Sequence, residues 1–388
     1  MQHFLRIEKL PPYVFAIVDD LKMQARHAGE DIIDFGMGNP DNPPPQQIID
    51  KLCEAAKKRH NHRYSASRGI VNLRRAMAQY YQRRFGVEVD HEQEVVTTIG
   101  IKEGFSHLMW ATVNPGDAVM VPTPAYPIHM YAVAFANGEV LRLAMTSADD
   151  MLAQMQHFCR HHQPRPKMVV LNFPHNPTTM CVDLTFFQKV VALAQEEGLI
   201  VVHDFAYADL VFDGYHAPSL LQVPGAKDVG IEFFSLSKSF NMPGWRVGFA
   251  LGNSTVVGAL RKIKSYLDYG IFQPLQIAST VALNELDTEV DAICELYRQR
   301  RDVLVEGLQR LGWDVPKPQA TMFVWAHIPE PYRAMGSLEF CKHVLKEAKV
   351  AVSPGIGFGE GGDQYVRFAL IENAHRTRQA LRGLRRLF

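Results

Sequence analysis

The central part of the chain alternates short apolar runs with longer amphipathic stretches, and this alternation is the strongest constraint on the fold. The predicted strands are residues 95–99, 118–121, 168–171, 199–202, 232–236 and 247–251. Several of these runs are apolar on both faces, as parallel strands are when helices cover both sides of a sheet. Residues 102–113 and 184–197 have the spacing of helices. The pattern predicts an α/β fold with a mostly parallel central sheet flanked by helices.

The two ends of the chain differ from the centre. From about Val290 a charged amphipathic helix is followed by two strand-like pieces, TMFVWAHI and QYVRFAL, and by a basic helix. Near the other end, the prolines of GMGNPDNPPP prevent a continuous helix. We therefore predict a large α/β domain over residues 45–285. A smaller, discontinuous α+β domain would combine residues 1–44 with residues 286–388.

Composition narrows the class of protein. Hydrophobic residues make up 47% of the 388 residues, which is enough for a large core. Forty-one basic residues balance forty-one acidic ones, so no global field favours nucleic acid or an anionic membrane. The five cysteines are scattered and odd in number, which argues against a disulfide framework. With no signal-peptide pattern and no membrane-spanning run, we expect a cytoplasmic enzyme without a nucleic-acid or membrane partner.

Polar residues follow the predicted strands at the point where each strand ends. In an open parallel sheet, ligands bind beyond the carboxyl ends of the strands. The residues in such positions are Gly100, Ile101, Lys102, Tyr126, Asn176, Asp204, Tyr207, Ser237, Lys238 and, shortly afterwards, Arg246. Together they describe a pocket for an aromatic, anionic and electrophilic ligand.

Each of these residues also has an ordinary explanation. The stretch from Gly100 to Lys102 could be a plain strand-to-helix turn, or a helix N-terminus that offers N–H groups to an anion. Asp204 ends a very apolar strand and needs a partner, which could be a structural donor or a cationic ring nitrogen. Lys238 could be a solvated lysine, or a partly buried amine with a lowered pKa that forms a Schiff base.

Several motifs resemble those of the fold-type I, class I/II aminotransferases, which use pyridoxal 5′-phosphate (PLP). SLSKSFNMPGWRVG is similar to the family's lysine motif, and NFPHNPTT is similar to its N-P-x-N-P-T-G segment. DFAY and YSASRGIVNLR match two further segments. The resemblance covers essentially the whole chain. It is strongest toward the bacterial alanine-forming glutamate–pyruvate aminotransferases, through stretches such as LPPYVF and VSPGIGFGEGGDQYVRFALIEN.

The resemblance implies a role for each matching residue. Lys238 would hold PLP as a Schiff base and shuttle the proton, while Asp204 would pair with the pyridinium nitrogen. Asn176 and Tyr207 would hydrogen-bond the phenolic oxygen of the ring, and Tyr126 would stack on its face. The residues expected to hold the phosphate are Gly100, Ile101, Lys102, Ser235, Ser237, Arg246 and, from the neighbouring subunit of a homodimer, Tyr64.

Substrate contacts follow from the same resemblance. Arg367 would clamp the α-carboxylate with help from Asn176 and the backbone at Gly38. Arg367 also lies opposite the apolar face of QYVRFAL, where the alternative is an ordinary solvent-facing side chain. We further expect Tyr13 to line the pocket for the substrate side chain.

The expected reaction is ping-pong transamination between glutamate and pyruvate, which gives 2-oxoglutarate and alanine. An LL-diaminopimelate aminotransferase or a cysteine-S-conjugate β-lyase-like PLP enzyme is the alternative, because these enzymes share the early steps of the reaction and differ in the pocket that selects the substrate. A PLP-sensing regulator on the same fold is a hypothesis from another class. It would need a DNA-binding unit, and we expect none in the short segment before Gly36.

Two positions depart from the family's pattern. Thr179 replaces the usual glycine of NPTG, and a β-branched residue disfavours positive φ, so we expect a slightly different turn. Ile101 replaces a small or hydroxyl residue, so a side-chain contact to the phosphate is expected to be missing. Cis peptide bonds are expected before Pro124 and Pro177.

Two further signals are rejected. Gly357, Gly359 and Gly362 spell G-x-G-x-x-G, but a predicted strand follows them instead of the helix that a dinucleotide site requires. We expect a flexible loop near the cleft there. The cluster around His157 and His161 lacks acidic or second cysteine ligands, so we expect no metal site.

Overall fold

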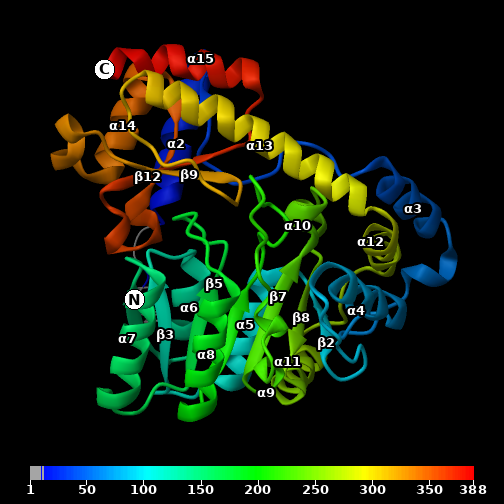
Figure 1. Ribbon diagram of the computed structural model, residues 1–388. Helices are drawn as coiled ribbons and strands as arrows, with labels where there is room; N and C mark the ends of the chain where they lie inside the picture. Colours follow the sequence, from blue (N-terminus) through cyan, green and yellow to red (C-terminus); the bar gives the residue numbers. More distant parts are fainter. Residues whose placement is uncertain (1–9, 11–12) are drawn as a thin grey trace, which may run out of the picture.

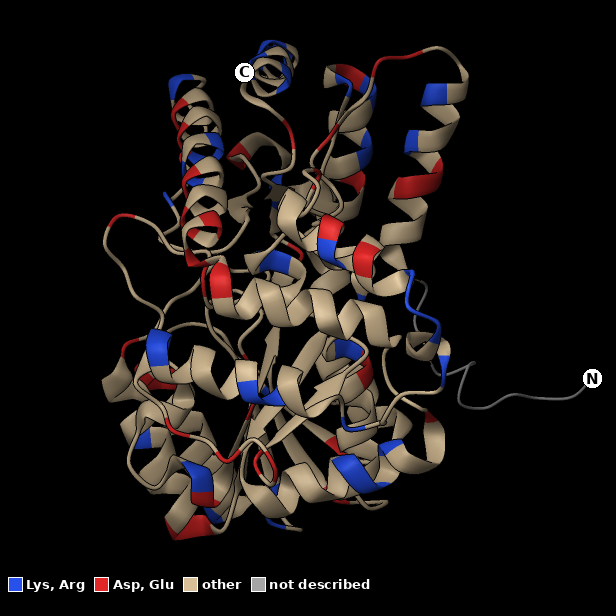
Figure 2. Ribbon diagram, turned by 90° about the vertical axis from the view of Figure 1, so that its right-hand side faces the viewer, with Lys and Arg blue, Asp and Glu red and all other residues tan. Residues whose placement is uncertain are grey.

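The computed structural model describes residue 10 and residues 13–388. Figure 1 shows a lower part built around a large sheet and an upper part in which segments from the N-terminal and C-terminal regions of the chain lie together. Basic and acidic segments are interspersed over the helices in Figure 2, in keeping with the balanced charge. No helix within the described residues is both long and apolar enough to cross a bilayer.

The large sheet has seven strands in the order β2-β8-β7-β6-β5-β3-β4. Its strands are β2 (Val95–Thr98), β3 (Ala118–Thr123), β4 (Glu139–Ala144), β5 (Met168–Asn172), β6 (Ile200–Asp204), β7 (Gly230–Ser235) and β8 (Gly248–Gly252). Strand β8 runs against its neighbours, β2 and β7, while the pairs from β7 to β4 are parallel. The predicted mostly parallel sheet is therefore confirmed.

Helices cover both faces of this sheet. Successive residues of β3 enter different cores: Val121 packs with α5, α6 and α11, whereas Met120 packs with α7 and α8. Helices α3, α4 and α12 share a third core with β2, β7 and β8. The bounds are α3 (Gln46–Ala56), α4 (Val71–Phe85), α5 (Ile101–Thr112), α6 (Pro127–Phe135), α7 (Ala148–His161), α8 (Leu184–Glu197), α9 (Ala226–Val229), α10 (Leu236–Ser239), α11 (Ser254–Leu267) and α12 (Gln273–Glu285).

The upper part joins the two ends of the chain around another core. Its helices are α2 (Val14–His27), α13 (Asp287–Arg310), α14 (Gly336–Ala348) and α15 (Ala374–Leu384). Its strands are β1 (Ile33–Asp34), β9 (Phe323–His327), β10 (Val350–Ala351), β11 (Ser353–Pro354) and β12 (Tyr365–Ala369). Val18 and Phe35 pack in the same core as α13, α14 and α15. The proposed domain limits, 45–285 against 1–44 with 286–388, stay a prediction.

Short 3-10 helices complete the chain and bear on one rejected signal. They are η1 (Arg59–His62), η2 (Leu220–Gln222), η3 (Pro243–Trp245), η4 (Glu330–Met335), η5 (Gly355–Phe358), η6 (Glu360–Gly362) and η7 (Arg385–Leu387). The G-x-G-x-x-G stretch forms η5 and η6, and β12 comes directly after them. The geometry that a dinucleotide fingerprint requires is therefore not formed there.

Local sequence signals account for the helix limits that were predicted well. Helix α8 begins after Asp183, whose side chain accepts a hydrogen bond from the Phe186 N–H at 2.9 Å. It ends before Gly198, which has φ +69°. The edge strand β4 was missed, because only Leu141 and Leu143 of EVLRLA are buried and the run is too polar to look like a buried parallel strand.

The turn at Thr179 corrects one expectation. Thr179 adopts φ +62°, so the prediction that threonine would change the turn is wrong. The Thr179 N–H donates to the His175 carbonyl, and the His175 N–H donates to the Met180 carbonyl, both at 2.9 Å. These backbone bonds impose the left-handed conformation on a residue that disfavours it. The bonds before Pro124 and Pro177 are cis, as predicted.

Replacing Thr179 by glycine is expected to stabilise the protein. Glycine adopts positive φ without strain, and the relief exceeds its larger entropy loss on folding, for a net gain of about 1 kcal/mol. The thermal unfolding midpoint of Thr179→Gly should lie above that of the wild type. Thr179→Ala is the control because it keeps the Cβ atom at the same φ. A Thr179→Gly midpoint at or below that of Thr179→Ala would contradict this explanation.

Candidate active site

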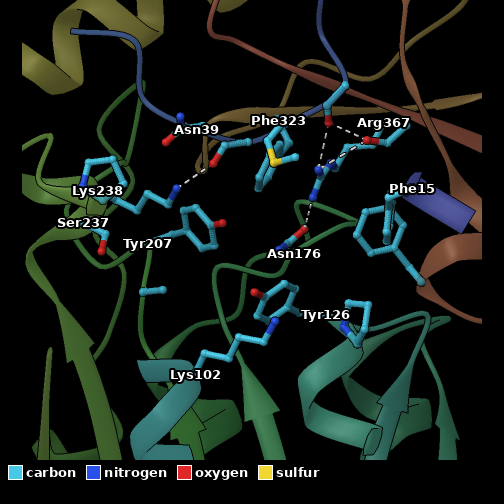
Figure 3. Close-up of a pocket in the computed structure, with 18 of the residues that line it drawn as sticks. Phe15, Asn39, Lys102, Tyr126, Asn176, Tyr207, Ser237, Lys238, Phe323 and Arg367 are labelled. Carbon is cyan, nitrogen blue, oxygen red and sulfur yellow. Dashed lines mark hydrogen bonds between the residues drawn. The ribbon is translucent and has the colours of Figure 1, made fainter. Parts of the chain in front are cut away.

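The carboxyl ends of β3, β5, β6 and β7 open into a cavity of about 450 Å³ beneath the upper part of the molecule. Figure 3 shows its walls converging from the sheet below and from the small sheet above. The predicted site residues that line it are Tyr13, Gly38, Ile101, Lys102, Tyr126, Asn176, Asp204, Tyr207, Ser235, Ser237, Lys238, Arg246 and Arg367. The fold therefore brings residues that are far apart in sequence into one pocket.

Lys238 lies on α10, directly beyond the end of β7. Its Nζ donates a hydrogen bond to the Gly38 carbonyl at 2.7 Å, a contact drawn in Figure 3. Burial, reinforced by the positive charges of Arg367 and Arg246, lowers the pKa of Lys238 to about 7. A large fraction of this amine is therefore neutral and nucleophilic at neutral pH.

Asp204 ends β6 and already has structural hydrogen-bond donors. The His129 Nε2–H donates to Oδ2 at 2.9 Å, and the Ala206 N–H donates to Oδ1 at 3.1 Å. Asn172 donates to the Asp204 main-chain carbonyl at 2.7 Å. The sequence left open whether the partner of Asp204 is a structural donor or a cationic ring nitrogen. The structure is compatible with both, because Asp204 has a structural donor and also lines the pocket.

Sequence reasoning missed His129. Its ring lies on α6 and is buried against Phe105, with the ring centroids 5.2 Å apart. A histidine three residues after Tyr126 on an apolar helix gives no strand-end signal, so nothing in the local pattern marks it. Only the tertiary structure brings it to Asp204, at the end of β6.

Two tyrosines form walls of the pocket. Tyr207 is buried, and burial raises its pKa well above the usual range, so its hydroxyl remains a proton donor. Burial and the Asp204 charge also raise the pKa of Tyr126. In Figure 3 the Lys102 side chain extends toward Tyr126. Neither phenol is ionised at neutral pH.

One end of the cavity is an anion cradle. Gly100 has φ +74°, and a Cβ atom there would lie 2.0 Å from Nη2 of Arg246. Ile101 and Lys102 begin α5, so their N–H groups are free of intrahelical partners. The Ser235 hydroxyl bonds that of Ser237 at 2.9 Å. These groups are donors or cations, which fits the phosphate of PLP, and Gly100 leaves room for the guanidinium.

Arg367 lies at the opposite end, on β12. Its Nη1 donates to Asn176 Oδ1 at 2.7 Å, and its Nη2 donates to the Gly36 carbonyl at 3.2 Å. Its Nε is buried and has no hydrogen-bond partner among the described residues. Burial lowers the pKa of Arg367 to about 10, so the guanidinium is still charged at neutral pH. A cation with a spare donor can bind a carboxylate.

Tyr64 is a predicted site residue that lies outside this pocket. Its side chain is 84% exposed and rests against Tyr269, with the ring centroids 4.5 Å apart. The structure contains one chain, so the predicted contact of Tyr64 with a neighbouring subunit stays a prediction. Gly100 is likewise not among the residues that line the pocket, but it lies next to Arg246, which is.

One group among the described residues has ligand atoms close enough for a metal: Glu103, His107 and Asp268. The ammonium of Lys264 already lies 2.8 Å from Glu103 and 2.9 Å from Asp268. A lysine therefore supplies the positive charge at this cluster. The rejected pair His157 and His161 stacks ring on ring along α7.

Comparison with known proteins agrees with the geometry. The family model described as aminotransferase class I and II matches residues 30–384. The glutamate-pyruvate aminotransferase AlaC of Escherichia coli K12 is 56% identical over 387 residues, which cover all of this chain and 94% of that protein. An LL-diaminopimelate aminotransferase of Moorella thermoacetica is 44% identical over 387 residues, covering all of this chain and 98% of that one.

Solved structures are similar to this chain over its full length. Substrate-bound BacF from Bacillus subtilis superposes with a TM-score of 0.93 at 32% identity, over all of this chain and 98% of that one. A single mutant of Thermus thermophilus aspartate aminotransferase superposes with a TM-score of 0.91 at 27% identity, over the full length of both. The chain belongs to the class I and II aminotransferases, enzymes of fold type I whose cofactor is pyridoxal 5′-phosphate.

Proposed function

We propose that this aminotransferase moves the amino group of glutamate to pyruvate and so forms 2-oxoglutarate and alanine. The observation that carries the chemistry is a buried amine, Lys238, with a pKa of about 7 in one pocket with Asp204 and Arg367. The choice of substrates is supported by the likeness to the E. coli glutamate-pyruvate aminotransferase. LL-diaminopimelate is the second candidate donor, because the Moorella relative is also similar.

The pocket residues divide into those that hold the cofactor and those that hold the substrate. When bound, PLP supplies an electrophilic carbon and an electron-withdrawing ring that stabilise negative charge developing at the substrate Cα. The residues proposed to hold its phosphate are Gly100, Ile101, Lys102, Ser235, Ser237, Arg246 and, from a second subunit, Tyr64. Asp204 would accept a hydrogen bond from the ring nitrogen, Asn176 and Tyr207 would hydrogen-bond the phenolic oxygen, and Tyr126 would pack on the ring face.

Lys238 carries the proton transfer. Its Nζ removes the proton from the substrate Cα and later returns a proton to the product. A pKa near 7 suits both tasks, because the amine is neutral often enough to act as a base and protonated often enough to act as an acid. Arg367 binds the α-carboxylate together with Asn176 and the backbone at Gly38, and Tyr13 lines the space for the substrate side chain.

Replacing Lys238 by alanine is expected to abolish the first half-reaction. The measurement follows the visible band of the holoenzyme in a single turnover with glutamate. The wild type should lose this band as the half-reaction proceeds, and the variant should not complete that conversion. Lys346→Ala, which removes an exposed lysine, is the control and should behave as the wild type. Circular dichroism should show an unchanged fold for both. Retention of single-turnover chemistry in Lys238→Ala would exclude the assigned role.

The lowered pKa of Lys238 predicts how cofactor uptake depends on pH. The free amine must be neutral to react, and it loses its proton as the pH rises through about 7. The rate of PLP incorporation into the cofactor-free protein should therefore rise through that range and then level off. A rate that keeps rising toward the ordinary lysine pKa of 10.5 would show that the amine is not depressed.

A substrate screen tests the reaction itself. Glutamate with pyruvate should give the highest kcat/KM, with alanine and 2-oxoglutarate as products. LL-diaminopimelate with 2-oxoglutarate tests the second candidate, and pyruvate released from a β-thio amino acid tests a β-lyase. Preference for either of these would overturn the proposed substrate pair while leaving the family assignment intact.

We also place the enzyme in the cytoplasm as a homodimer with shared active sites. Tyr64 packs against Tyr269, which is 64% exposed, and Tyr266, three residues earlier in the chain, is 83% exposed. Large exposed apolar groups of this kind mark association surfaces. In this dimer the Tyr64 hydroxyl would contact the phosphate of the PLP bound in the neighbouring subunit.

Introducing a charge into this aromatic group is expected to weaken the dimer. Tyr269→Glu should shift the molar mass in analytical ultracentrifugation from two chains toward one, because a carboxylate is costly to bury in an interface. Met335→Glu, at an exposed apolar position in the upper part of the molecule, is the control. Equal dissociation of both variants, or none in Tyr269→Glu, would argue against this interface.

A further inference from the structure

Arg367 is a buried cation without an acidic partner among the described residues. Its side chain is 6% exposed, and within the described part of the chain no carboxylate lies within ion-pair distance of it. Its acceptors are neutral: Asn176 Oδ1, the Gly36 carbonyl and, at 3.4 Å, the Ser353 hydroxyl. Because an unpaired buried charge is costly, something else must stabilise this guanidinium.

Two phenylalanine rings contact the guanidinium. The Cζ atom of Arg367 lies 4.0 Å from the ring centroid of Phe323 and 4.6 Å from that of Phe358. Among the described residues these are the two shortest cation–ring distances. Within that same set the two rings form no aromatic pair with each other, so each makes its own contact with the guanidinium. The negative face of each ring attracts a cation without neutralising it.

The rings themselves are fixed by their neighbours. Phe323 lies so close to Gly38 that a Cβ atom there would come within 2.6 Å of the ring. Phe358 packs edge-on against Phe15 of α2, with the centroids 4.9 Å apart. Both rings are 1% exposed and therefore have little freedom to rotate away.

We propose that Phe323 and Phe358 are positioning residues that hold the Arg367 guanidinium in place while leaving its charge free for the substrate carboxylate. The proposal rests on the proposed function, in which Arg367 binds that carboxylate. A protein carboxylate at the same place would also fix the arginine, but it would compete with the substrate for the same donors. Aromatic faces do not compete in this way, because the attraction between a ring face and a cation does not use up the N–H donors that a carboxylate binds.

The test measures carboxylate binding without turnover. Propionate, which has a carboxylate but no amino group, is titrated into the holoenzyme and followed by the change in the visible band of the bound cofactor. Phe323→Leu and Phe358→Leu should each weaken propionate binding by about tenfold, because leucine fills the space but has no negative face. KM for both amino acid and oxoacid should rise in parallel, with kcat and PLP affinity nearly unchanged.

Matched controls separate positioning from general damage. Phe340→Leu removes a fully buried ring from the same core without touching Arg367, and should leave propionate binding unchanged. Trifluorophenylalanine in place of Phe358 keeps the ring size but withdraws electron density from its face. It should weaken binding in the same direction, which keeps the test valid if a leucine variant does not fold.

The outcomes distinguish this inference from the proposed function. If Arg367→Lys binds propionate as tightly as the wild type, Arg367 does not bind the carboxylate and the proposed function of that residue fails. If Arg367→Lys weakens binding while the Phe323, Phe358 and Phe340 variants all match the wild type, the function stands and the positioning role is wrong. Loss of binding in the two ring variants alone supports the inference.

Discussion

The common edge of the parallel strands is the constraint on which the site depends. Neighbouring parallel strands lie about 4.8 Å apart and end on the same side of the sheet. Asp204 pairs in register with Asn172 of β5 and Phe233 of β7, so the acid must emerge close to the end of β7. Strand β7 ends at Ser235, and Lys238 lies three residues further along the chain, on α10. The acid and the amine therefore share one cavity whatever the loops around them do.

The same burial has different effects on the two cations of the pocket. The Lys238 amine can release its proton, so burial lowers its pKa into the neutral range and makes it reactive. Arg367 stays charged at neutral pH even though burial lowers its pKa, so the protein must stabilise a permanent charge. It does so with the neutral acceptor of Asn176 and the faces of Phe323 and Phe358. In the proposed function, one cation serves as a base and the other as a fixed electrostatic anchor.

The parts of the structure that the sequence predicted poorly depend on surroundings that the local residue pattern does not show. Strand β4 was missed because it is an edge strand with one solvated face, and its polarity hides it. The prediction about the turn at Thr179 was wrong because the backbone hydrogen bonds between His175 and Thr179 and between His175 and Met180 outweigh the conformational preference of a single side chain. His129 gave no signal because helix packing, and not a strand end, brings it to Asp204.

The sequence by itself determined most strands and some helices of the centre, the polar residues at the strand ends and the family motif around Lys238, because these depend on periodicity and on neighbours close along the chain. Only the tertiary structure decided which groups surround each functional atom. The Gly38 carbonyl reaches Lys238 across 200 residues, and Asn176 meets Arg367 across 191. Such contacts arise when the upper part of the molecule packs over the sheet, and no local pattern encodes them.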